Sequence, residues 1–61
     1  MRYEKGEIVY IISSNAPLVC TIRKNINDLV YEVQAKNGLV FTMTKDLIFP
    51  SKEKAIMSYK R

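Results

Sequence analysis

An Asn-Gly pair, Asn37–Gly38, lies between two runs in which apolar and polar residues alternate, and no other feature restricts the fold as much. The runs 29–36 and 39–44 have a period of two, which is typical of strands with one buried and one solvated face. Asn-Gly between such runs predicts a β-hairpin with a two-residue type I′ turn, because both central residues of that turn need a positive φ. The expected inward-facing residues are Leu29, Tyr31, Val33, Ala35, Leu39, Phe41 and Met43.

Two more strands are expected before the hairpin. Residues 7–13 are rich in β-branched and aromatic side chains and predict a first strand that is apolar on both faces, with Val9 and Ile11 on one of them. Such a strand is usually covered on both sides, so we expect the C-terminal segment or a second subunit to shield the face with Val9 and Ile11. Residues 14–17 are turn residues, and residues 18–24 predict a second strand with three inward side chains, Leu18, Cys20 and Ile22.

The last part of the chain predicts a connection and a helix. Residues 45–50 fit a tight connection followed by a short last strand that ends at Pro50. Ser51 fits the N-cap of a short helix over residues 52–61. A free helix of this length is marginal, so we expect it to form only when docked on the sheet. Three of its apolar residues share one face: Ala55, Ile56 and Tyr59.

Over residues 3–50 the chain resembles the small SH3-like barrels of the KOW and Tudor type. The segments "YEKGEIVYI" and "YEVQAKNGLVFTMTKDLIFP" are similar to the entry strand, hairpin and final turn of such domains. The residues that match are Tyr3, Gly6, Glu7, Val9, Tyr31, Val33, Gly38, Asp46, Leu47 and Pro50. In this arrangement Asp46 would cap a single 3₁₀ turn and Leu47 would fill the end of the barrel.

Short strands with tight turns and this resemblance together imply an all-β fold, an SH3-like small barrel of about five antiparallel strands with a short C-terminal helix. We expect a single domain over residues 1–61, with the barrel over 3–50 and a basic helix or tail over 51–61. The family's best-known pockets are missing. Leu18 stands where KOW motifs carry glycine, the loops "SSNAP" and "KNG" lack the aromatic cage of methyl-reading Tudor domains, and the chain has no Trp.

Composition argues against an enzyme, a cofactor or a metal site. The 61 residues include no His and one cysteine, Cys20, which we expect to be a buried small hydrophobe. The charged start "MRYEKGE" and the short apolar runs predict a soluble cytoplasmic protein with no membrane contact. The abundance of Ile, Lys and Asn is typical of a small accessory protein from a low-GC bacterium or its phage.

Positive charge is concentrated at the C-terminal end. Residues 1–50 carry six basic and five acidic side chains, whereas residues 51–61 carry four basic side chains and one acidic side chain. Such a tail either only adds solubility or neutralises nucleic-acid phosphates without reading sequence. The first hypothesis is therefore weak, sequence-independent nucleic-acid binding. Its expected contacts are Lys52, Lys54, Lys60 and Arg61, with Arg23, Lys24 and Lys36 as secondary candidates.

The second hypothesis is a protein-interaction or regulatory module. A chain of this length buries only roughly 60% of the surface that its unfolded form exposes, so a partner can supply stability that the core lacks. The apolar face around Val9 and Ile11 would then form a homodimer or block another protein. Neither hypothesis involves a small-molecule substrate.

Overall fold

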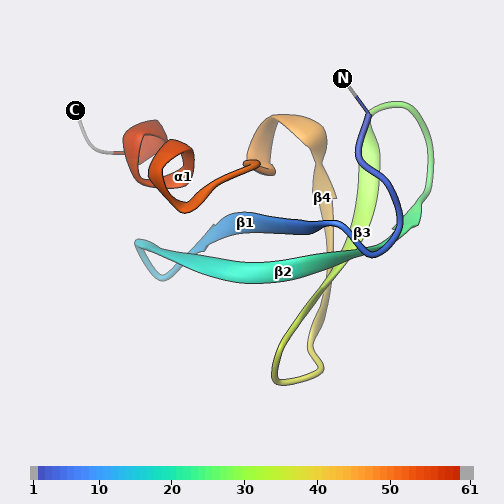
Figure 1. The fold of residues 1–61 in the computed structure, drawn as a ribbon, viewed down its shortest axis with the longest axis horizontal. Helices are drawn as coiled ribbons and strands as arrows, with labels where there is room; N and C mark the ends of the chain where they lie inside the picture. Colours follow the sequence, from blue (N-terminus) through green and yellow to red (C-terminus); the bar gives the residue numbers. More distant parts are fainter. Residues whose placement is uncertain (1, 60–61) are drawn as a thin grey trace.

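The computed structural model describes residues 2–59, except for the side chain of Tyr59. In this part of the chain, four strands pair antiparallel in sequence order as one sheet, and a short helix follows them. The mostly β architecture with a C-terminal helix is therefore confirmed. In chain order the elements are β1 (Ile8–Ser13), β2 (Ala16–Asn25), β3 (Val30–Ala35), β4 (Val40–Thr44), the 3₁₀ turn η1 (Lys45–Leu47) and α1 (Lys52–Tyr59), as labelled in Figure 1.

A fifth strand was expected after the final turn, and the described residues contain a single bridge in its place. The backbone N–H groups of Tyr10 and Phe49 each donate to the other residue's carbonyl at 2.8 Å. The pairing is limited to this one pair of residues, which Pro50 follows. The chain after η1 is nevertheless tied back to β1.

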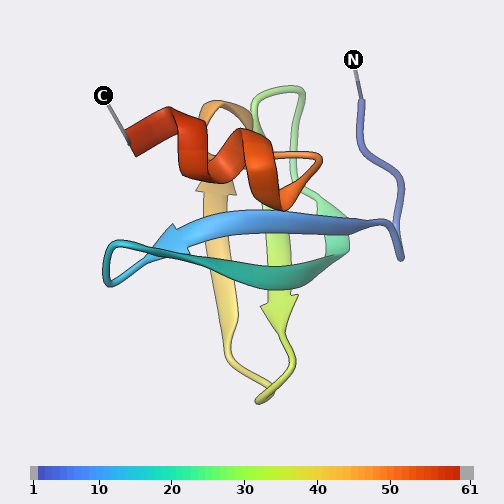
Figure 2. The same cartoon turned by 60° about the vertical axis from the view of Figure 1, so that its left-hand side comes forward.

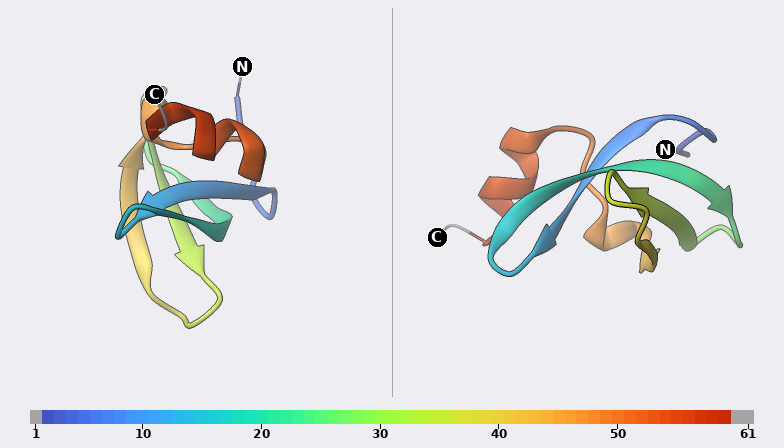
Figure 3. Two further views of the ribbon diagram at one scale, coloured as in Figure 1. Left: turned by 90° about the vertical axis from the view of Figure 1, so that its left-hand side faces the viewer. Right: turned by 90° about the horizontal axis from the view of Figure 1, so that it is seen from below.

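The sheet is bent into two hairpins that cross each other. In Figure 2 the β1–β2 hairpin runs across the β3–β4 hairpin, with α1 above the first hairpin, and Figure 3 shows the same crossing from two other sides. The long strand β2 pairs with β1 and with β3, and a register irregularity between Ile22 and Lys24 interrupts its pairing with β3. Such a bulge increases local twist and lets one strand serve both hairpins.

The core lies on the inner side of this bend. Its cluster of buried residues comprises Val9, Ile11, Cys20, Ile22, Tyr31, Val33, Ala35 and Ile48, with Tyr3, Leu18, Phe41 and Met43 packed against it. Most of the residues predicted to face inward are thus confirmed in the core. Leu29 and Leu39 are corrections, because they lie just outside β3 and β4 and are 58% and 57% exposed. Leu47 is also exposed, and its neighbour Ile48 is the residue that enters the core.

The two hairpin turns differ from the sequence expectation. At Asn37–Gly38 only Gly38 has a positive φ, of 93°. The N–H of Gly38 donates to the Ala35 carbonyl and that of Ala35 to the Leu39 carbonyl, which is a three-residue loop with a glycine bulge rather than a type I′ turn. The two-residue turn with two positive φ values lies between β1 and β2 instead, at Ser14 and Asn15.

The C-terminal helix begins as expected. The Ser51 hydroxyl oxygen accepts a hydrogen bond from the backbone N–H of Lys54 at 3.2 Å, which confirms the N-cap. The helix packs against β1 and β2, with Ala55 fully buried and Ile56 half-buried. Thr44, not Asp46, is the cap residue of η1, and its side chain makes no capping hydrogen bond. The described part of the chain includes no helix that is both long and apolar enough to cross a membrane.

Candidate functional site

An apolar groove lies where β1, β4, η1 and α1 meet. It is an open hollow of about 400 Å³ lined by Ile12, Met43, Asp46, Leu47, Phe49 and Ser58. These residues come from three separate stretches of the chain, namely β1, residues 43–49 and α1, so the groove exists only in the folded molecule. We refer to this hollow as the groove.

Backbone and core contacts fix the wall of the groove that contains Leu47 and Phe49. Phe49 is hydrogen-bonded to Tyr10 of β1, and Ile48, which lies between Leu47 and Phe49, is buried in the core. The hydroxyl of Tyr3 also donates a hydrogen bond to the Ile48 carbonyl at 3.2 Å. This segment is therefore held from three sides, and the groove does not depend on a free loop for its shape.

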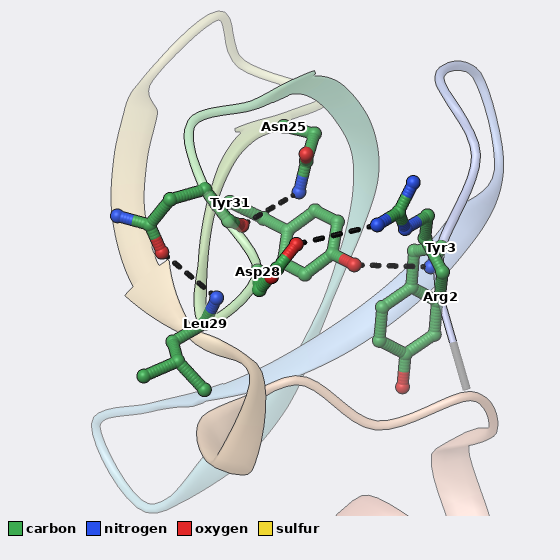
Figure 4. A network of polar contacts seen from close by, with 7 residues as sticks. Arg2, Tyr3, Asn25, Asp28, Leu29 and Tyr31 are labelled. Carbon is green, nitrogen blue, oxygen red and sulfur yellow. Dashed lines mark hydrogen bonds and ion pairs between the residues drawn. The ribbon is translucent and has the colours of Figure 1, made fainter.

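The N-terminal segment that carries Tyr3 is itself anchored to the sheet. The backbone N–H of Tyr3 donates to the hydroxyl of Tyr31 at 3.3 Å, and the two rings meet edge to face with centroids 5.6 Å apart (Figure 4). An ion pair between Arg2 and Asp28 lies beside them at 3.2 Å. Both of its side chains are mostly exposed, so it contributes little to stability, and the two tyrosines provide the firm contact.

The loop between β2 and β3 supports η1 from the other side. The Asn27 side-chain oxygen accepts a hydrogen bond from the Leu29 N–H at 2.8 Å, and the Asn25 amide donates to the Asn27 carbonyl at 2.8 Å (Figure 4). The Leu29 carbonyl in turn accepts from the N–H of Lys45, the first residue of η1. The local Asn turns thus position the 3₁₀ turn that supplies Asp46 and Leu47 to the groove.

The groove has one charged side chain among its lining residues. Asp46 takes part in neither of the two ion pairs found among the described residues. The hydroxyl of Ser58 donates to the Ala55 carbonyl at 2.6 Å, so its proton is already used within α1. The groove therefore offers apolar contact with a hydrogen-bond acceptor at one side.

The basic residues predicted to contact nucleic acid do not gather into one patch within the described chain. Lys52 and Lys54 are exposed in the first turn of α1, on either side of Glu53. Arg23 pairs with Glu32 at 3.1 Å, with Lys24 exposed beside it in β2. Lys36 lies in the turn between β3 and β4, at the opposite end of the molecule from α1 (Figure 2). Lys60 and Arg61 are outside the described residues.

Val9 and Ile11, which were predicted as an interaction face, are buried within the folded chain. They are 0% and 2% exposed, respectively, and form part of the core, because the sheet bends toward their side of β1. The residues of the other face are only partly covered. Tyr10 and Ile12 are half-buried beside α1 and the Phe49 bridge, and Ile8 is 60% exposed.

The remaining reactive and aromatic residues are mostly enclosed. Cys20 is buried, as expected, and desolvation raises the pKa of its thiol, so the unreactive protonated form prevails near neutral pH. The described aromatic side chains are all buried or half-buried, and they provide no exposed platform on which bases could stack. No group of three or more potential metal ligands occurs among the described side chains.

Comparison with protein-family models, curated proteins and solved structures found no match to this chain. The groove is therefore identified from this structure alone. Sequence reasoning missed it because Ile12 and Ser58 are far along the chain from the other lining residues, which lie within residues 43–49. The available signal was the apolar face of the first strand that includes Ile12, together with the apolar residues of the "DLIF" segment.

Tyr3→Phe tests the contact that holds the groove wall. The variant loses the hydrogen bond to Ile48, so the free energy of unfolding near pH 7 should fall by about 1 kcal/mol. Burial and the nearby Glu7 and Tyr31 raise the pKa of the Tyr3 phenol. The Tyr3 phenol therefore ionises at a lower pH in the unfolded chain than in the folded protein. Because ionisation then favours the unfolded state, the wild type should lose stability as the pH rises above about 10, and the loss should be smaller in the variant.

The measurement is urea unfolding of both proteins between pH 7 and pH 11. Cys20 also has a raised pKa but is present in both chains, so its contribution cancels in the difference. Equal stability at pH 7, with parallel curves at alkaline pH, would show that Tyr3 does not hold this segment.

Proposed function

We propose that this chain is a small non-enzymatic binding module that contacts a partner protein through the groove. The observation that carries the proposal is the groove itself, an apolar hollow of about 400 Å³ with a single carboxylate at its side. Recognition sites of this kind combine apolar burial with a few polar groups that set orientation. Leu47, which is 52% exposed, gives a partner apolar area to bury.

The barrel interpretation belongs to the same proposal. The Tyr10–Phe49 bridge brings the end of the sheet segment back to its first strand, as in a small barrel of the SH3-like type. The sequence resemblance over residues 3–50 supports this interpretation. SH3-like folds serve many functions, so the proposed activity depends on the groove rather than on the fold.

Leu47→Asp is the direct test of the groove. Peptides would be selected from a random phage-displayed library on the wild-type protein, and their affinities measured by fluorescence anisotropy. Aspartate at this position removes apolar contact and adds a second negative charge near Asp46, so binding should weaken by roughly tenfold or more. Leu39→Asp is the matched control, because Leu39 is similarly exposed but does not line the groove.

Loss of affinity in Leu47→Asp with unchanged affinity in Leu39→Asp is the expected result. Selected peptides that bind all three proteins equally well would contradict a binding site at the groove. Failure to select any peptide on the wild type would contradict the proposal as well.

Nucleic-acid binding by the C-terminal end is the second candidate. The supporting observation is that Lys52 and Lys54 are exposed on α1 and belong to neither ion pair found in the described residues. The helix that carries them leads to Lys60 and Arg61 in the sequence. Four such charges would give a salt-dependent, sequence-independent affinity.

Oligonucleotide anisotropy at several salt concentrations tests this candidate. With all four charges engaged, log K should fall against log salt with a slope of roughly −3, and Lys52→Gln/Lys54→Gln should reduce that slope by roughly 2. Substitution is preferable to truncation because buried Ala55 anchors the helix. Lys5→Gln/Lys45→Gln is the control with the same loss of charge, and an equal effect of both pairs would exclude a specific role for the tail.

A further inference from the structure

The outer edge of β4 carries a row of backbone groups that the sheet does not use. In an antiparallel pair, successive residues alternate between bonding to the neighbouring strand and pointing away from it. Ala35 donates to the Leu39 carbonyl and Lys45 donates to the Leu29 carbonyl, which fixes the alternation at both ends of β4. The N–H and C=O groups of three residues therefore point outward: Val40, Thr42 and Thr44.

This edge lacks the features that usually protect one. Natural edge strands carry charged side chains, Pro or bulges that block pairing with another chain. Residues 39–44 include no charged residue and no Pro, and the β3–β4 register runs without a shift from Val30 to Gln34. Val40 and Thr42 are exposed on the outer face of the strand, and Phe41 and Met43 on its inner face are only half-buried.

We propose that β4 pairs with β4 of a second copy of this chain, in an antiparallel arrangement with a two-fold axis at Thr42. This proposal goes beyond the proposed function, because it concerns the free edge of β4 rather than the groove. An interface with two-fold symmetry must be complementary to itself. The strand meets that requirement in its backbone, its side chains and its flanking charges.

With the axis at Thr42, β-branched residues face one another on the outer side of the strand and large apolar residues face one another on the inner side. Thr42 lies opposite Thr42 of the second copy, and Val40 lies opposite Thr44, so the outer face has β-branched residues throughout. Phe41 lies opposite Met43 on the inner face, where a thioether and an aromatic ring make a favourable contact. All three outward-pointing residues find partners for both their N–H and C=O groups.

The flanking charges fit the same register. The axis brings the β3–β4 turn of one copy, with Lys36, beside η1 of the other copy, with Asp46. Neither residue belongs to an ion pair among the described residues. Lys45 precedes Asp46, so η1 as a whole is neutral and does not repel the incoming turn. A second copy is therefore favoured over a partner of strong charge.

Thr42→Lys and Thr21→Lys make a matched pair of variants for the test. Both threonines are exposed, but Thr42 is on the free edge, whereas Thr21 in β2 is paired on both sides. Sedimentation equilibrium up to millimolar protein should show the 7.1 kDa chain associating to twice its mass in the wild type and in Thr21→Lys. Thr42→Lys should remain a monomer at the same concentrations, with an unchanged circular dichroism spectrum.

Amide hydrogen exchange of the wild type provides a second readout that needs no variant. Protection of the Val40, Thr42 and Thr44 amides should rise with protein concentration, while protection of Val33 should not change. A wild type that stays monomeric at millimolar concentration would overturn the proposal, and so would a dimer that Thr42→Lys leaves intact. Protection of these amides only when a selected peptide is added would also overturn it and would leave the groove proposal standing.

Discussion

The hydrogen-bonded bridge between Tyr10 and Phe49 is the contact on which the rest of this structure depends. Its two bonds of 2.8 Å link the chain after η1 to the first strand. Their direct contribution to stability is modest, at about 1 kcal/mol each. Their positional effect is larger, because they place Ile48 in the core and set the point from which α1 starts. Without the bridge, the groove would lose one wall and the helix would lose its approach to β1 and β2.

The contacts around the bridge compensate for the small size of the domain. The two tyrosines at positions 3 and 31 link the N-terminal segment to the core, and the Tyr3 hydroxyl reaches the Ile48 carbonyl. The Asn25–Leu29 loop holds η1 through Lys45. These polar contacts connect segments that are far apart in the sequence. They therefore restrain the same few residues that shape the groove.

Much of the sheet could be predicted from local pattern, because alternation reports which side chains share a face. It correctly assigned Cys20, Ile22, Tyr31, Val33 and Ala35 to the interior. The same pattern failed for Leu29 and Leu39, because periodicity does not say where a strand stops. It also led us to expect a partner on the Val9 and Ile11 face of β1, whereas that face is buried, since the choice of face depends on the direction in which the sheet bends.

The candidate site was harder to predict than the fold. The groove needs Ile12, Met43 and Ser58 to meet, and only the crossing of the two hairpins and the return at Phe49 bring them together. The free edge of β4 likewise becomes visible only from the hydrogen-bond register. The charge distribution, by contrast, is plain in the sequence, yet the described basic residues are spread over separate ends of the molecule.

Amide hydrogen exchange at Tyr10 and Phe49 would test the central role of the bridge most directly. Both amides donate within the bridge, so each reports whether it is closed. If the bridge is an integral part of the fold, both should exchange as slowly as the amide of Val33 in the core, through global unfolding. Rapid exchange at Tyr10 and Phe49 while Val33 stays protected would show that the bridge opens by itself, and the account of the groove would be wrong.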